Sequence, residues 1–310
     1  MRLPVPEDIE NTILVTHAEC IDESSCAIMF IRAGGKEENI KFIPARSVER
    51  FIKDELDSLS EQFIIFADVG LNNEPNLEKY ADIIEKRGNC VMLDHHVTST
   101  GLHSRTWADV RQNVCGTEML RQYLSTFTTF DYHETSNNVA LAKVIQDHDL
   151  WLEKIPEAKD LASYCVFFGQ DTFVSNFLWR DIVVNDLFTE DEKKMLDVLL
   201  KKRDKNIEAA IKKGILQKIK WGDKEAMCVY IVSSEMNVTQ LLDTALKRNP
   251  HASVACQINI DRNSVSLRSR DGTDVSEIAM YYGGGGHKAA AGHSLPQHLV
   301  EDIIETIHGN

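Results

Sequence analysis

The stretch Val91-Met92-Leu93-Asp94-His95-His96 places an acid and two adjacent histidines directly after an apolar run. An uninterrupted apolar run of this kind is typical of a parallel strand buried on both faces. Open α/β sheets hold their ligands at the carboxyl ends of such strands. Taken alone, however, the stretch is equally compatible with a strand that ends in a polar turn.

Apolar runs and amphipathic segments alternate on both sides of this stretch. Strands are predicted at residues 13–15, 39–44, 63–67 and 90–93, and helices at residues 26–32, 47–56 and 76–86. Alternation at this spacing implies right-handed crossovers and a parallel sheet covered on both faces. The sequence therefore predicts an α/β fold for the first part of the chain.

The pattern changes after Cys115. Helices are predicted at residues 117–124 and 137–150, and a long charged helix at residues 190–213 is the candidate connector. A second unit then follows, with a strand at 228–232, helices at 238–248, 274–280 and 299–307, and a hairpin of 252–260 with 264–268.

Composition limits the class of protein. The chain has 310 residues, of which 43% are hydrophobic and 26% charged, which is ordinary for a globular protein. No apolar run approaches the roughly 18 residues that a membrane span needs, and residues 1–8 do not resemble a signal peptide, so we expect a cytoplasmic protein without membrane contact. The seven scattered cysteines never form a Cys-x-x-Cys pair, which argues against a disulfide framework and a zinc ribbon.

The formal net charge of −14 opposes attraction to a long polyanion. Long duplex DNA is therefore not an expected partner. Any phosphate ligand should be small and held by local cations or by bound metal.

Acids and histidines recur near the ends of other predicted elements. They are His17 and Asp22 after the first strand, Asp68 after the third, Asp94 and His95 after the fourth, and Asp147, His148 and Asp149 on a later helix. Imidazole and carboxylates without a thiolate suit an ion such as Mn²⁺. Two such ions about 3.5–4 Å apart, sharing a carboxylate, can activate water for attack on phosphorus.

The second unit contains a candidate anion site. The glycines at 283–286 leave backbone N–H groups free to approach an anion, and His287 follows them. The run lacks the context of a dinucleotide fingerprint and the ending of a P-loop, so a tight turn is the alternative. Arg268 adds a guanidinium suited to bidentate phosphate binding.

These motifs together resemble a known family. Asp94-His95-His96, preceded by Asp68-Val69-Gly70 and followed by the glycine-rich run at 283–292, is similar to the DHH phosphoesterases that carry a C-terminal DHH-associated domain. The resemblance spans nearly the whole chain. It implies a Rossmann-like DHH catalytic domain with a parallel sheet (1–188), a helical linker (189–213) and a smaller α/β substrate-binding domain with a mixed sheet (214–310).

The resemblance also implies roles for individual residues. The implied metal ligands are His17, Glu19, Asp22, Asp68, His95 and Asp147. The implied catalytic residues are Asp68, Asp94, His95 and His96. Asp94 would orient the metal ligands without itself binding the ion. The substrate phosphate would be held by His96, Arg268, Gly284, Gly285, Gly286 and His287.

The first motif departs from the family form. The stretch 17–23 reads His-Ala-Glu-Cys-Ile-Asp-Glu and is closest to the variant His-Gly-Asp-Cys-Leu-Asp-Gly. Glu19 thus stands at an acid position, and Glu23 stands where glycine is expected. This difference leaves a non-catalytic site open as an alternative.

The resemblance implies a hydrolase that uses two Mn²⁺ ions, with Mg²⁺ or Co²⁺ as possible substitutes. Its expected substrates are short 5′-phosphorylated oligoribonucleotides or linear dinucleotides such as pGpG, cleaved to mononucleotides, and a homodimer is allowed. The alternatives are a phosphatase of nucleoside bisphosphates or polyphosphate, and a nucleotide-binding sensor with a degenerate metal site.

Overall fold

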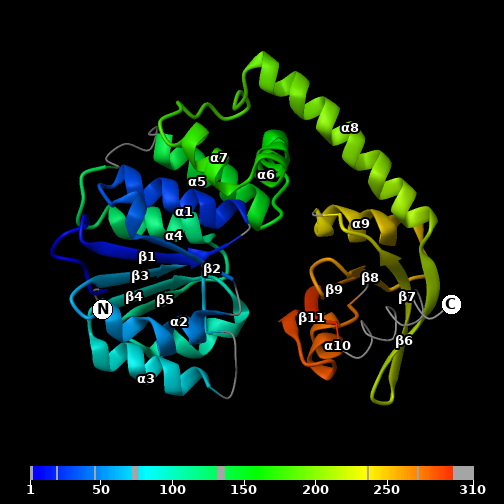
Figure 1. The fold of residues 1–310 in the computed structure, drawn as a ribbon, viewed down its shortest axis with the longest axis horizontal. Coiled ribbons are helices and arrows are strands. Elements are labelled where there is room, and N and C mark those ends of the chain that lie inside the picture. Colours follow the sequence, from blue (N-terminus) through cyan, green and yellow to red (C-terminus); the bar gives the residue numbers. More distant parts are fainter. Residues whose placement is uncertain are drawn as a thin grey trace. The chain divides into compact units, whose positions relative to one another are not determined.

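The computed structural model describes residues 3–18, 20–44, 47–71, 76–130, 137–235, 237–270 and 272–295. It divides into two compact units, Met1–Leu196 and Asp197–Asn310, and each unit has its own sheet (Figure 1). The division falls within helix α8 (Glu190–Lys212), inside the predicted linker. The predicted helix at 299–307 lies outside the described residues.

The first unit contains the predicted parallel sheet. Its strands are β1 (Thr12–His17), β2 (Ile40–Ile43), β3 (Phe63–Ala67), β4 (Cys90–Asp94) and β5 (Ala108–Val110). The order is β2-β1-β3-β4-β5, with every neighbouring pair parallel. Strand β5 was not predicted, because three residues are too few to show a periodic pattern.

Helices cover both faces of this sheet. The α-helices are α1 (Ile21–Arg32), α2 (Val48–Asp54), α3 (Leu77–Arg87), α4 (Gly116–Leu124), α5 (Asn137–Asp149), α6 (Pro156–Phe168) and α7 (Gln170–Phe177). Short 3₁₀ helices are η1 (Glu37–Asn39), η3 (Leu56–Leu59) and η4 (Val97–Ser104). Helices α1 and α4 lie on one face, and α2 and α3 lie on the other (Figure 1).

Helix α1 begins at Ile21, earlier than the predicted start at Cys26. The sulfur of Cys20 accepts the backbone N–H of Asp22 at 3.3 Å and so caps the helix. Asp22 and Glu23 in the first turn suit the positive end of the helix dipole. The apolar pattern missed this turn because Asp22, Glu23, Ser24 and Ser25 are polar, although the structure buries them.

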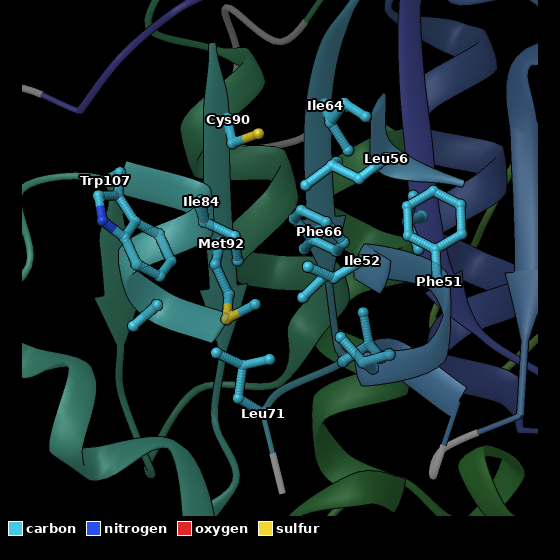
Figure 2. Packing of buried hydrophobic residues seen from close by; sticks show 14 of the residues in the cluster. Phe51, Ile52, Leu56, Ile64, Phe66, Leu71, Ile84, Cys90, Met92 and Trp107 are labelled. Carbon is cyan, nitrogen blue, oxygen red and sulfur yellow. The ribbon is translucent and has the colours of Figure 1, made fainter. Parts of the chain in front are cut away.

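The strands carry apolar side chains on both faces. Ile64, Phe66 and Met92 point toward α2 and α3, where they pack with residues such as Phe51 (Figure 2). The intervening residue Ile65 is equally buried on the opposite face. Burying each such side chain stabilises the fold by about 1.5–3 kcal/mol. The continuous apolar runs in the sequence reflect this two-sided burial.

The second unit contains a mixed sheet, as predicted. Its strands are β6 (Ile215–Trp221), β7 (Lys224–Val232), β8 (Val254–Asn259), β9 (Ser264–Ser269), β10 (Gly285–His287) and β11 (Ala290–Ser294). The order is β10-β11-β9-β8-β7-β6, in which β7 and β8 are parallel and the other pairs antiparallel. Strand β6 was not predicted because most of its residues are exposed and lack an apolar run.

Two helices pack on opposite faces of this sheet. Helix α9 (Val238–Arg248) packs with Val229 and Ala255, and α10 (Val275–Tyr281) packs with Cys228 and Val254. Adjacent residues of one strand thus pack against different helices, because successive side chains of a strand point to opposite faces of the sheet.

No helix in the described part of the chain combines the length and the apolar character that a membrane span requires.

Candidate metal centre

The three central strands of the first sheet end at one edge. Thr16 in β1 pairs with Ala67 in β3, and Ala67 pairs with Leu93 in β4. The backbone N–H of Asp68 donates to the carbonyl of Leu93 at 3.0 Å, which extends the alignment beyond the strands. The polar residues that follow these strands therefore gather at the carboxyl edge, as the sequence predicted.

Asp68 has an unusual backbone and a closely packed side chain. Its φ of 55° lies in the left-handed region, which is uncommon for a residue other than glycine, and residues held in this conformation cluster at functional sites. The residue is 5% exposed. A Cβ atom at Gly116 would overlap the Asp68 side chain, so only glycine at the start of α4 allows this position.

Potential ligand atoms form three overlapping groups at this edge. Within each group, one ligand atom per residue lies within 4.8 Å of the others. The groups are Asp68 with His95 and His96, Asp22 with His95 and Asp149, and Cys20 with Glu23 and Asp68. Asp68 and His95 each belong to two groups. This sharing is the pattern needed to hold more than one ion.

The carboxyl groups repel one another in this setting. Burial raises the pKa of Asp68 well above its usual value, and the charges of Asp22 and Glu23 raise it further. Burial and the charge of Asp22 raise the pKa of Asp149 to about 7. Among the strongest influences on these two carboxyls, only the histidines act in the opposite direction. A divalent cation would relieve this repulsion.

The residues present fit a divalent ion. Glu23 Oε2, Asp68 Oδ1 and Asp149 Oδ2 are buried and accept no hydrogen bond within the described part of the chain. Buried carboxylate oxygens normally have a partner, because leaving one unpaired costs about 1–3 kcal/mol or more. His95 Nε2 lies 3.0 Å from Asp68 Oδ1 and His95 Nδ1 lies 3.6 Å from Asp149 Oδ2, so the imidazole stands beside both carboxylates. Carboxylate and imidazole donors suit Mn²⁺ or a similar ion.

Asp22 joins this cluster while also fixing a helix. Its two carboxylate oxygens accept the backbone N–H groups of Gly116 and Thr117, both at 2.7 Å. These N–H groups form the positive end of α4, where an anion is stabilised. Each carboxylate oxygen retains a second lone pair, so Asp22 can still contact an ion.

Asp94 and His96 form an ion pair beside the cluster. His96 Nδ1 lies 2.7 Å from Asp94 Oδ1, and the Asp94 side chain is fully buried. Burial lowers the pKa of His96, but the hydrogen bond and charge of Asp94 outweigh it and raise the pKa to about 9. A Cβ at Gly70 would overlap Asp94 and Ser99, which explains the glycine in Asp68-Val69-Gly70. Asp94 thus fixes the position of His96 through this contact.

The structure separates the two acids of Asp147-His148-Asp149. Asp147, which was predicted as a ligand, accepts the backbone N–H groups of Lys154 and Ile155 at 3.0–3.2 Å. Asp149 instead lies with Asp22 and His95 in the cluster. Residues two apart on a helix point about 200° apart, so only one of the two acids can face the site. The sequence places the two acids only two residues apart, and this spacing does not indicate which of them faces the site.

His17 and Cys20 are also found near the cluster. His17 Nδ1 contacts Glu23 Oε1, and the His17 side chain is 26% exposed. Cys20 Sγ lies with Glu23 and Asp68, although the sequence predicted a donor set without sulfur. Its place at the helix cap turns the sulfur toward the first turn of α1. Glu19 lies outside the described residues.

Apart from His96, the residues predicted to bind phosphate lie in the second unit, where Arg268 and His287 occupy one row across the sheet. Arg268 in β9 pairs with Ala290 in β11, and Ala290 pairs with His287 in β10. The Arg268 guanidinium donates to Thr239 Oγ1 at 2.6 Å, and burial lowers its pKa. The side chain of His287 lies outside the described residues.

The glycine run forms a tight hairpin rather than an open loop. The N–H groups of Gly283 and Gly284 donate to the carbonyls of Met280 and Ala279 at the end of α10. A Cβ at Gly284 would overlap Gly292, and Gly286 has a φ of 142°. These features explain most of the run by packing alone. Gly285 is different, because a Cβ there would meet nothing within 4 Å.

Comparisons with known proteins agree with this architecture. A model of the DHHA1 domain matches residues 226–309. Oligoribonuclease NrnB of Bacillus subtilis (strain 168) is 26% identical over 300 residues, which cover 92% of this chain and 73% of the relative. An uncharacterized protein, R106 of Acanthamoeba polyphaga mimivirus, is 24% identical over 303 residues, which cover 90% of this chain and 66% of the relative.

Solved structures share the fold. The pGpG-specific phosphodiesterase PggH of Vibrio cholerae aligns with a TM-score of 0.50 and 13% identity, covering 96% of this chain and 97% of that one. RecJ of Thermus thermophilus, solved with Mg²⁺, aligns with a TM-score of 0.52 and 13% identity, covering 95% of this chain and 48% of that one.

The motifs, the fold and these matches support the same class of protein, a DHH phosphoesterase. Members of this family are metal-dependent enzymes.

Proposed function

We propose that this chain is a divalent-metal-dependent phosphodiesterase that hydrolyses short oligoribonucleotides, including linear dinucleotides such as pGpG, to mononucleotides. The observation that carries the proposal is the cluster of buried carboxylates and histidines at the carboxyl edge of the first sheet, with oxygens that lack hydrogen-bond partners among the described residues. The similarity to an oligoribonuclease supports the choice of substrate.

The proposed ligands are Asp22, Asp68, His95 and Asp149, with His17 nearby. Divalent ions bound there would activate water for attack on phosphorus and neutralise charge on the phosphoryl oxygens. Mn²⁺ is the ion that we propose, with Mg²⁺ and Co²⁺ as substitutes. The protonated His96, held by Asp94, would donate to a phosphate oxygen of the substrate.

Arg268 is proposed to hold a second phosphate of the substrate. Its guanidinium is partly buried and oriented by Thr239, which leaves it ready for a bidentate contact. The net charge of −14 favours a short substrate over a long one, because a long polyanion would be repelled along its length. We also propose that the protein acts in the cytoplasm.

The test is hydrolysis by purified protein with Mn²⁺ of a panel that contains pGpG, longer RNA, cyclic dinucleotides, 3′-phosphoadenosine 5′-phosphate and polyphosphate. We expect pGpG and other short RNA to be cleaved fastest. Preference for the bisphosphate or for polyphosphate would replace the proposal with a phosphatase. Nucleotide binding without turnover of any member would indicate a sensor.

A further inference from the structure

Glu23 stands where the related family motif has glycine, and the structure gives its side chain a specific place. The side chain is 2% exposed and lies in the first turn of α1. A buried carboxylate costs several kcal/mol unless it is paired or bound to a cation. Its surroundings therefore have to account for its charge.

The two oxygens of Glu23 have different surroundings. Oε1 contacts His17 Nδ1. Oε2 is buried and accepts no hydrogen bond from any described residue. Glu23 also forms a group with Cys20 and Asp68, whose ligand atoms lie within 4.8 Å of one another. One oxygen is thus held by a histidine, while the carboxylate lies beside a second acid, Asp68, whose Oδ1 is 3.0 Å from His95 Nε2.

A purely structural role would not explain this arrangement. If Glu23 had only a structural role and bound no metal, we would expect a cation or a hydrogen-bond donor of the protein to contact Oε2. Within the described part of the chain, no lysine or arginine forms an ion pair with Glu23, and its neighbour Asp68 carries the same charge. Two acids placed together without a cation destabilise each other, whereas a shared divalent ion stabilises both.

We propose that Glu23 is a ligand of the divalent ion bound by Asp68, which it contacts through Oε2. The inference rests on the proposed function, since it assumes that the cluster binds metal. Oε1 holds His17 through Nδ1 and leaves the other ring nitrogen, Nε2, for the ion. The glutamate is then a functional substitution in this chain and does not mark a decayed site.

The experiment compares Mn²⁺ binding by the full-length wild-type chain, Glu23→Gly and Glu23→Gln, using electron paramagnetic resonance of free Mn²⁺ and isothermal titration calorimetry. Glu23→Gly restores the glycine of the family motif. Glu23→Gln keeps the size of the side chain and an oxygen for His17, but replaces the free carboxylate oxygen with an amide. We expect both variants to lose about tenfold or more in Mn²⁺ affinity at one site. Replacing a residue that merely hydrogen-bonds to a metal ligand already lowers metal affinity by about 10–100-fold.

Three results would overturn the inference. Unchanged affinity in both variants would remove Glu23 from the site. Tighter binding by Glu23→Gly would show that the glutamate obstructs the ion. Loss in Glu23→Gly alone, with wild-type affinity in Glu23→Gln, would show that Glu23 only positions His17.

A matched control is Glu192→Gln, which removes a carboxylate paired with Arg180 at 2.7 Å on the same unit. We expect its Mn²⁺ affinity to equal that of the wild type. Thermal unfolding in chelator checks the folding of each variant. Glu23→Gln should have an unfolding temperature no lower than that of the wild type, because it removes a buried repulsion.

If the wild type itself binds no Mn²⁺, the proposed function fails as well. If it binds Mn²⁺ and hydrolyses pGpG while Glu23→Gly binds equally well, only the inference fails.

Discussion

The carboxyl edge of the first sheet and the glycine hairpin of the second unit were both predicted to bind ligands, yet their polar groups differ. At the carboxyl edge, oxygens of Glu23, Asp68 and Asp149 are buried without hydrogen-bond partners in the described chain. In the hairpin, Gly283 and Gly284 already donate to carbonyls of α10. Buried polar groups without a hydrogen-bond partner indicate that a ligand binds there. Groups that already have partners within the protein need no ligand to account for them. A bound ligand is therefore better supported at the carboxyl edge than at the hairpin.

The largest expected effect that sharpens this contrast is at Asp68, which belongs to two of the ligand groups. Asp68→Ala should lower the rate of pGpG hydrolysis by about a thousandfold or more, because metal-based charge stabilisation supplies several kcal/mol. Asp82→Ala, which removes an exposed partner of Arg105, is the control and should hydrolyse pGpG like the wild type. Substantial activity in Asp68→Ala would defeat the metal assignment.

A second comparison separates the two acids of α5. Asp149→Asn should lower Mn²⁺ affinity by about 10–100-fold without loss of stability, since it removes a buried charge that Asp22 repels. Asp147→Asn should keep the Mn²⁺ affinity but lower the free energy of unfolding by about 1–3 kcal/mol, because it weakens the bonds to Lys154 and Ile155. Calorimetry and urea unfolding measure the two quantities. The opposite assignment of effects would favour Asp147 as the ligand.

Removal of metal should reveal the repulsion within the cluster. At a Mn²⁺ concentration of about 100 times its dissociation constant, binding adds about 2.7 kcal/mol to the stability of the folded state. For a unit of this size, that raises the midpoint of thermal unfolding by several degrees, at about 2–4 °C per kcal/mol. Differential scanning calorimetry in Mn²⁺ and in chelator measures the shift. The shift should vanish in Asp68→Ala, and a shift that persists there would place the ion elsewhere.

The smallest effects on metal binding and on catalysis should come from the hairpin. Gly286→Ala should lower stability by about 1–3 kcal/mol, because the φ of 142° and the close approach of Ala291 exclude a side chain. Gly285→Ala meets nothing within 4 Å and should leave stability unchanged. A rise in KM for pGpG in Gly285→Ala would then report contact with substrate, and an unchanged KM would indicate that this glycine has no part in binding.

Much of the fold follows from local patterns in the sequence. The strands through Ile64 and Val91 are continuous apolar runs because the sheet buries both of their faces, and this made them visible. Strand β6 was missed because most of its side chains are exposed. The start of α1 was missed because the residues that follow Ile21 in its first turn are buried polar ones, Asp22, Glu23 and Ser24.

The candidate site was also predictable only in part. Asp68 and His95 follow buried strands and were named from the sequence, and the structure brings them together. The choice between Asp147 and Asp149 depends on the rotation of α5 against its neighbours, which spacing does not encode. The place of Glu23 depends on which oxygens find partners, and only coordinates give that information.

The most direct test of the account is the binding of Mn²⁺ to the isolated wild-type chain and to Asp68→Asn, measured by equilibrium dialysis with electron paramagnetic resonance detection. The account predicts that the wild type binds Mn²⁺ and that Asp68→Asn loses most of this affinity while remaining folded in chelator. Equal binding by the two proteins, or no binding by the wild type, would contradict the claim that the carboxyl edge of the first sheet is a metal centre.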